Sequence, residues 1–375
     1  MITFATLDTA DKSLTTQFVR LPFRIYRDIP QWVPPFDADV RLTLNRKKHP
    51  YYEHSDAALF YAEEDGRMIG RLAVLENRPF NKHHGTHKAN FYLFECENDL
   101  EAARGLFERA FDWARQRGLN EINGPKGFSA FDGYGLLVEG FEQRQMMNMA
   151  NYNPPYYQDL IEALGFEKEV DFVDFYLKAS DFRMPEKVHQ IAERVVQRGS
   201  FQVQQLKSKA ELRKWAHRLG EAYNQSFINN WEYYPFSDRE IQFIADNIMT
   251  VAVPKLIKLI THQERVVGFS LGFPDISAAM QRAQGRLNPL TILDILLELR
   301  RSKWISLNGG GVLPEFQGRG GNALLYVELE KSVRSMNFEH AEMTQNADTA
   351  SMMRQDIERM GGHAYKVHRI YKKTL

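Results

Sequence analysis

The sequence has little cysteine, no excess of either charge and no long apolar run. Cys96 is the only cysteine among 375 residues, which excludes an internal disulfide and a cluster of zinc-binding thiolates. Lysine plus arginine number 48 and aspartate plus glutamate number 48, so no overall positive field would attract a phosphate backbone. No stretch reaches the roughly eighteen apolar residues of a membrane span, and the first residues lack a signal-peptide pattern. We therefore expect a cytoplasmic protein with neither a membrane nor nucleic acid as partner.

Two halves of the chain follow one pattern of elements. Residues 57–75 and 256–273 each alternate apolar positions on both sides of a polar turn, which predicts a β-hairpin. A strand, a helix and another strand are expected next, at 90–95, 100–117 and 119–123 in the first half and at 303–307, 323–336 and 340–344 in the second. Each half ends with a helix closed by glycine and a final strand, which we expect at an edge of the sheet.

The connection between the halves is KASDFRMPEKV, in which Ser180, Asp181 and Pro185 mark a turn before a helix near 187–198. We place a domain boundary at about residue 180, giving domains 1–180 and 181–375. The alternation of strands and helices predicts an α/β (α+β) fold in each domain, a mixed sheet flanked by helices.

The stretch GVLPEFQGRGG, residues 311–321, follows a strand pattern and precedes a helix pattern. Glycines at such a corner let phosphate oxygens approach backbone N–H groups, and the helix dipole adds positive potential there. A pyrophosphate ligand is one interpretation, and a turn that binds nothing is the other. A nucleotide triphosphatase loop fits poorly, because no lysine follows the glycines.

Val312, Pro314, Gln317 and Gly320 resemble the acyl-CoA signature V-x-P-x-x-Q/R-x-x-G-x-G/A of the GNAT superfamily of N-acetyltransferases. The resemblance implies two tandem GNAT-like folds with mostly antiparallel sheets, acyl-CoA such as acetyl-CoA as donor, and no metal. It also implies that the strand before the loop diverges from its neighbour and pairs with the pantetheine arm. By position, the residues implied to contact the cofactor are Val312, Leu313, Gln317, Gly318, Arg319, Gly320, Gly321, Asn322 and Asn346.

Two positions depart from the family pattern. Asn322 stands where the signature has glycine or alanine. Ile357 stands four residues before Gly361, where many members place the tyrosine that protonates the departing thiolate. Asn346 matches the family asparagine that often faces the cofactor, although an asparagine also caps turns.

The N-terminal half resembles the same fold without the signature. At the corresponding corner it carries Asn98, Asp99 and Glu101, whose side chains would occupy the helix amides and repel pyrophosphate. We therefore expect no CoA site in that half. Its long glycine- and aromatic-rich loop, residues 122–141, is a candidate ligand-binding loop.

An amine acceptor must lose a proton before it attacks a thioester. Asp275 and Glu342 are the candidate bases, and each has surface charge as its alternative interpretation. The acceptor-binding candidates lie in residues 223–240, where an aromatic core cluster is the alternative; they are Asn230, Trp231, Tyr233 and Tyr234. His83, His84 and His87 indicate a solvated loop in preference to a metal site. Residues 290–299 predict a short amphipathic helix that covers an acyl channel, contacts a partner or packs on the core.

The sequence thus predicts an acyl-CoA-dependent N-acyltransferase that acetylates a small-molecule amine by direct attack on the thioester. Ile357 keeps open a noncatalytic CoA-binding or scaffold protein. The tandem plan keeps open an aminoacyl or long-chain acyltransferase of the Fem kind. The acceptor, the acyl length and the oligomeric state are not determined by the sequence.

Overall fold

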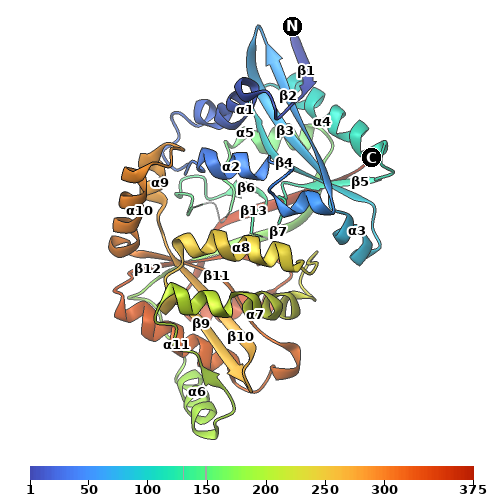
Figure 1. Ribbon diagram of the computed structural model, residues 1–375. Coiled ribbons are helices and arrows are strands. Elements are labelled where there is room, and N and C mark those ends of the chain that lie inside the picture. Colours follow the sequence, from blue (N-terminus) through green and yellow to red (C-terminus); the bar gives the residue numbers. More distant parts are fainter. Residues whose placement is uncertain (130, 148–149) are drawn as a thin grey trace.

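A mixed, mostly antiparallel sheet runs through both halves of the molecule and is flanked by helices (Figure 1). The computed structural model describes residues 1–129, 131–147 and 150–375; Ala130, in the predicted ligand loop, lies outside these ranges. The strands follow the order β1-β2-β3-β4-β5-β13-β7-β12-β11-β10-β9-β8, with β6 paired to β13.

The N-terminal half contains the predicted hairpin and the strand–helix–strand unit that follows it. Its strands are β1 (Ile2–Thr6), β2 (Asp56–Glu64), β3 (Arg67–Glu76), β4 (Lys88–Cys96), β5 (Glu121–Gly124), β6 (Leu136–Glu139) and β7 (Glu167–Lys178). Its helices are α1 (Lys12–Ile25), α2 (Asp37–Thr43), α3 (Arg78–His84), α4 (Leu100–Arg115) and α5 (Tyr156–Ala163).

The C-terminal half repeats this order. Its strands are β8 (Gln202–Val203), β9 (Ile257–His262), β10 (Arg265–Pro274), β11 (Trp304–Val312), β12 (His340–Ala347) and β13 (His363–Thr374). Its helices are α6 (Glu186–Arg198), α7 (Lys209–Phe227), α8 (Asp238–Val251), α9 (Ser277–Ala283), α10 (Pro289–Arg301), α11 (Gly321–Ser335) and α12 (Ser351–Arg359). Strand β11 continues through the glycines to Val312, five residues past the predicted end, because Gly268 to Ser270 of β10 pair with its glycine stretch.

The two halves exchange their final strands. Strand β7, from the N-terminal half, pairs antiparallel with β12, and β13, the last strand of the chain, pairs with β5. The two exchanged strands also pair with each other from His363↔Tyr176 to Lys372↔Glu167. The C terminus therefore lies in the N-terminal half, where the Leu375 N–H donates to the Asn120 carbonyl at 2.9 Å (Figure 1).

The prediction that each final strand lies at an edge was wrong, since both occupy the centre of the sheet. Periodicity predicts a strand but not its partner, and the partner here lies in the other half of the chain. The boundary near residue 180 remains a prediction about the sequence, while the sheet itself is continuous across it.

Separate hydrophobic clusters pack on the two halves. One contains Phe91, Phe107 and Phe166 in the N-terminal half, and another contains Leu259, Phe269 and Leu324 in the C-terminal half. At the junction, Ile370 of β13 is fully buried against Val170 and Phe172 of β7. The exchanged strands are thus joined by side-chain packing as well as by backbone hydrogen bonds.

Both parallel strand pairs diverge after a few residues. Strands β4 and β5 pair from Lys88↔Glu121 only to Asn90↔Asn123. Strands β11 and β12 pair from Trp304↔His340 only to Leu307↔Met343. Beyond Leu307, β11 still pairs with β10 along one edge, but its other edge no longer pairs with β12. The family resemblance implied this divergence.

Truncating Ile370 to alanine is expected to destabilise both halves together. The change removes a fully buried side chain at the β7–β13 contact and should cost about 2–5 kcal/mol. Hydrogen exchange should then accelerate at amides of β5 and of β12 by the same factor. Leu290→Ala, at a side chain that is 78% exposed, is the matched control. Unchanged exchange in β5 would contradict the coupling of the halves.

Candidate functional site

A cavity of about 720 Å³ opens where β11 separates from β12. One wall is the β11 backbone at Gly309, Gly310 and Gly311, where no side chain fills the space. Apolar residues of α11, β12 and α12 line another part: Leu325, Leu329, Val333, Met343, Met353 and Ile357. The volume is within the usual range for sites that bind small molecules and cofactors.

The glycine loop leads from β11 into an uncapped helix. Gly318 and Gly320 have φ of 73° and 85°, in the left-handed region that favours glycine. Gly320 is the N-cap of α11, so no side chain accepts from the N–H groups of the first turn, which also lacks an acidic residue. These amides and the positive end of the helix dipole are therefore free to meet an anion.

The equivalent helix of the N-terminal half is closed by its own side chain. Asp99 caps α4 and accepts from the Ala102 N–H at 2.9 Å, and Glu101 lies in the first turn. This geometry agrees with the prediction that acidic residues occupy these amides.

The predicted cofactor residues divide into those that line the cavity and those at its margin. Val312, Gln317, Asn322 and Asn346 line it, whereas Leu313 and the loop residues 318–321 are not among its lining residues. The Leu313 N–H donates to the Val267 carbonyl at 2.9 Å, so only its carbonyl is open to a ligand. The Asn346 side chain donates to the carbonyls of Met343 and Val173 at 3.0 and 3.2 Å, and so supports the divergence of β12.

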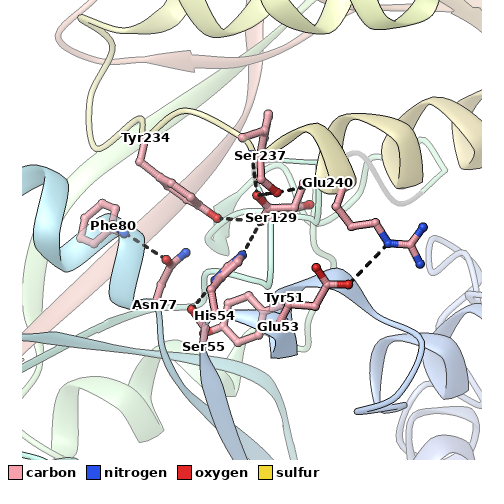
Figure 2. Close-up of polar contacts among 12 residues, drawn as sticks. Tyr51, Glu53, His54, Ser55, Asn77, Phe80, Ser129, Tyr234, Ser237 and Glu240 are labelled. Atoms are coloured by element: carbon pink, nitrogen blue, oxygen red, sulfur yellow. Dashed lines mark hydrogen bonds and ion pairs between the residues drawn. The ribbon is translucent and has the colours of Figure 1, made fainter.

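The four predicted acceptor residues, Asn230, Trp231, Tyr233 and Tyr234, all line the same cavity. Their segment lies between α7 and α8 and is held against the N-terminal half by the polar network in Figure 2. Tyr234 donates to Glu240 at 3.4 Å, and the His54 Nε2 lies 3.2 Å from the same Glu240 oxygen. Burial opposes ionisation of Glu240, but hydrogen bonds from His54 and Ser237 hold its pKa below the usual range.

The N-terminal half supplies part of the wall. Residues of the predicted ligand loop, Lys126 to Ser129 and Tyr134, line the cavity beside Phe172 of β7. The predicted ligand loop and the predicted acceptor segment, about a hundred residues apart in sequence, thus face one space.

Lys126 and Glu232 were not singled out by sequence analysis. Their Nζ and Oε2 atoms are 2.7 Å apart at the cavity wall, and Lys88 Nζ lies 2.9 Å from the other Glu232 oxygen. Burial disfavours the Glu232 carboxylate, but Lys126 and Lys88 lower its pKa to about 2. Glu232 also has a φ of 45°, an unfavourable conformation for a residue with a side chain. The signal in the sequence was their position within the two predicted ligand segments.

Asp275 and Glu342, the predicted bases, are not among the residues that line the cavity. Asp275 is 3% exposed and forms an ion pair with Arg144. Glu342 is fully buried, pairs with Lys366 and accepts from the Tyr365 hydroxyl.

Glu342 belongs to a buried charge cluster on β7, β12 and β13. Lys366 Nζ lies 3.9 Å from Asp174, and His368 Nδ1 lies 3.4 Å from the same carboxylate oxygen. Burial raises the pKa of Asp174 and of Glu342, and it lowers the pKa of His368 to about 3. A proton is therefore retained more readily among these carboxyl groups than in water.

Ile357, at the family acid position, is 3% exposed and lines the cavity with an apolar side chain. The His84 Nε2 contacts the Tyr233 carbonyl at 2.9 Å. In the described part of the chain, no group of three or more histidine, cysteine or acidic side chains is placed to hold a metal ion.

Comparison with known proteins identifies the fold. No protein-family model matches the sequence. The chain is 25% identical over 366 residues to Protein YghO of Escherichia coli (strain K12), covering 96% of this chain and 92% of that protein. It is 26% identical over 368 residues to the Bacterial ceramide synthase of Caulobacter vibrioides (strain NA1000 / CB15N), covering 96% and 94% of the two chains.

Among solved structures, a tandem GNAT protein from the clavulanic acid biosynthesis pathway matches with a TM-score of 0.56 and 12% identity. That match covers 100% of this chain and 98% of the other. The chain therefore has a tandem GNAT-like fold, which confirms the predicted fold class.

Replacing Glu232 by glutamine is expected to destabilise the protein in a pH-dependent way. The folded pKa of about 2 is below that of an unfolded glutamate, so the carboxylate stabilises the fold above about pH 4.5 and loses this effect as the pH falls toward 2. The wild type should exceed Glu232→Gln by about 3 kcal/mol in unfolding free energy at pH 7, and the difference should shrink in acid.

Chemical denaturation across this pH range measures the difference. Glu339→Gln removes a carboxylate that is 59% exposed and ion-paired to Lys303, and should change stability by less than about 0.5 kcal/mol. A difference for Glu232→Gln that does not vary with pH would refute the assigned pKa.

Proposed function

We propose that this protein is an N-acyltransferase that moves an acyl group from acyl-CoA to an amine. The observation that carries the proposal is that one cavity joins the open edge of β11, the α11 N-terminus at Asn322 and the aromatic segment from Trp231 to Tyr234. A donor and an acceptor can therefore meet in the same cavity.

The donor would be held mainly by backbone groups. The pyrophosphate would accept from the amides of the Gly318–Asn322 turn, where α11 has no capping side chain. The pantetheine arm would pair with the edge of β11 that β12 leaves open beyond Leu307. Asn346 would support this edge by fixing the divergence of β12.

The reaction is a direct displacement. The amine, as the free base, adds to the thioester carbonyl, the carbon–sulfur bond breaks, and the CoA thiolate leaves and takes up a proton. Backbone N–H groups facing the carbonyl would stabilise the negative charge that develops on its oxygen. Ile357 has no proton to donate. The thiolate would therefore be protonated by solvent or by the proton that the amine nitrogen loses as the amide forms.

The lining of the cavity favours a long acyl chain or a long-chain amine over the small partners that the sequence resemblance implied. Apolar side chains between α11 and α12 offer surface to a hydrocarbon chain. The Caulobacter relative is named a ceramide synthase, and a ceramide is the amide of a long-chain amino alcohol with a fatty acid. Acetyl transfer to a small amine is the alternative reaction, and the turnover assay below compares the two.

A noncatalytic acyl-CoA-binding role is the second candidate, because Ile357 occupies the acid position and the predicted bases lie outside the cavity lining. Binding without turnover would establish it.

Thermal unfolding with CoA, acetyl-CoA and palmitoyl-CoA tests the donor, since a ligand that binds only the folded state raises the midpoint with concentration. Release of free thiol from each acyl-CoA, with sphinganine or a short-chain amine as acceptor, tests turnover. The largest kcat/KM is expected for palmitoyl-CoA with sphinganine. No midpoint shift with any CoA compound would overturn the proposal.

Gly318→Asp is expected to weaken CoA binding at least tenfold by placing a carboxylate beside the pyrophosphate amides. A Cβ at Gly318 meets no atom within 4 Å. Gly318→Asn is the matched control, because asparagine has the same shape, tolerates the left-handed region and carries no charge. Gly320 is unsuitable, since a Cβ there would lie 2.6 Å from Val195 and 2.9 Å from Ile191. Equal affinities of the Asp and Asn variants in a CoA titration would argue against a pyrophosphate at this loop.

A further inference from the structure

Helix α10 leaves a row of large apolar side chains in solvent. Leu290 is 78% exposed, Leu293 54% and Leu296 50%, and Leu287 just before the helix is 50% exposed. The helix is well formed, because Asn288 caps it by accepting from the Thr291 N–H at 3.0 Å and Pro289 begins it. The exposed leucines are therefore a feature of an ordered helix.

The opposite face of α10 anchors it to the protein. Thr291 and Ile295 are buried, and Leu299 packs against the core of the C-terminal half. Leu290, Leu293 and Leu296 follow one another at intervals of three residues, so these exposed side chains form one stripe along a helix about 20 Å long. In Figure 1, α9 and α10 lie together at the periphery of the molecule.

Basic residues flank the stripe at both ends. Arg286 precedes the helix and Arg300 lies in its last turn; both are exposed, and neither side chain forms an ion pair with a described residue. The acidic residues of the helix, Asp294 and Glu298, both form ion pairs with Arg282, at 2.8 and 2.6 Å, so two carboxylates share one guanidinium. With Arg301, which also lies in the last turn, residues 282–301 carry four arginines against these two carboxylates, so the charge around the leucines is positive.

We propose that α10 docks the protein on an anionic lipid surface. The helix would lie in the plane of the interface, with Leu290, Leu293 and Leu296 among the acyl chains and Arg286 and Arg300 at the lipid phosphates. The charge pattern disfavours a second copy of this chain as the partner of the leucine stripe. Parallel and antiparallel pairing of two such helices would both place arginines next to arginines.

This mode of contact differs from a membrane span. In the described part of the chain, no helix is long and apolar enough to cross a bilayer. The expectation of no membrane partner depended on the absence of a span in the sequence, and a surface-docking helix does not require one. The proposal is independent of the acyltransferase reaction, although a lipid surface would also be the source of long-chain acceptors.

Sedimentation with vesicles tests the proposal on the full chain. The wild type should bind vesicles of phosphatidylcholine mixed with phosphatidylglycerol, and salt should weaken the binding. The triple variant Leu290→Gln, Leu293→Gln, Leu296→Gln should reduce the partition coefficient at least about tenfold. Replacing Arg286 and Arg300 by serine should cost roughly fivefold for each arginine on these vesicles.

Val196→Gln, at a side chain on α6 that is 58% exposed, is the matched control and should bind like the wild type. All these variants should retain the wild-type unfolding midpoint and its response to CoA, so loss of vesicle binding is separable from failure of the CoA site. Equal vesicle binding by the wild type and the triple variant would overturn the proposal. A change from dimer to monomer in the triple variant, with no vesicle binding by the wild type, would assign the helix to a second copy instead.

Discussion

The antiparallel pairing of β7 with β13 is the interaction on which the rest of this structure depends. These strands lie at the centre of the sheet, and each completes the half of the molecule that did not encode it. Without β13, β5 would lose its antiparallel partner; without β7, β12 would lose one too. Unpaired central backbone groups are costly, so neither half has a finished sheet of its own.

This exchange also determines where the cavity can form. Because the halves share a sheet, the loop at Lys126 of the first half lies beside the segment at Trp231 of the second, and Glu232 forms ion pairs with Lys126 and Lys88 across the junction. The N-terminal half therefore contributes residues to the wall of the cavity. A protein with only the C-terminal copy would leave this side of the cavity open.

Much of the fold could be predicted from the sequence, because it depends on local patterns. Hairpins, the helix that begins after Gly320 and the capping of α4 by Asp99 follow from periodicity and from residues with marked conformational preferences. The aromatic segment that was predicted to bind the acceptor lines the cavity, while its role stays a prediction. The strand exchange was not predictable. The apolar pattern around Ile370 predicts a buried strand residue whichever half of the molecule its strand pairs with.

The predicted bases show the same limit. Asp275 and Glu342 carry the right chemistry, but their partners Arg144, Tyr365 and Lys366 come from distant segments and are visible only in the fold. Equally, the leucines of α10 have the composition of a core helix, and only their surroundings reveal that they are exposed. Residue type therefore indicates which interactions a side chain can form, and its burial and neighbours in the fold show which of them it forms.

The buried charge cluster has a consequence for how the strands align. Alternate residues of a strand face opposite sides of the sheet, so a slip of β13 by one residue would turn Lys366 away from Asp174 and Glu342. Two buried carboxyl groups would then lose the cation that pairs with them, which is strongly destabilising. In a chain whose two halves repeat one order of elements, these ion pairs therefore favour the observed register of β13 over a register shifted by one residue.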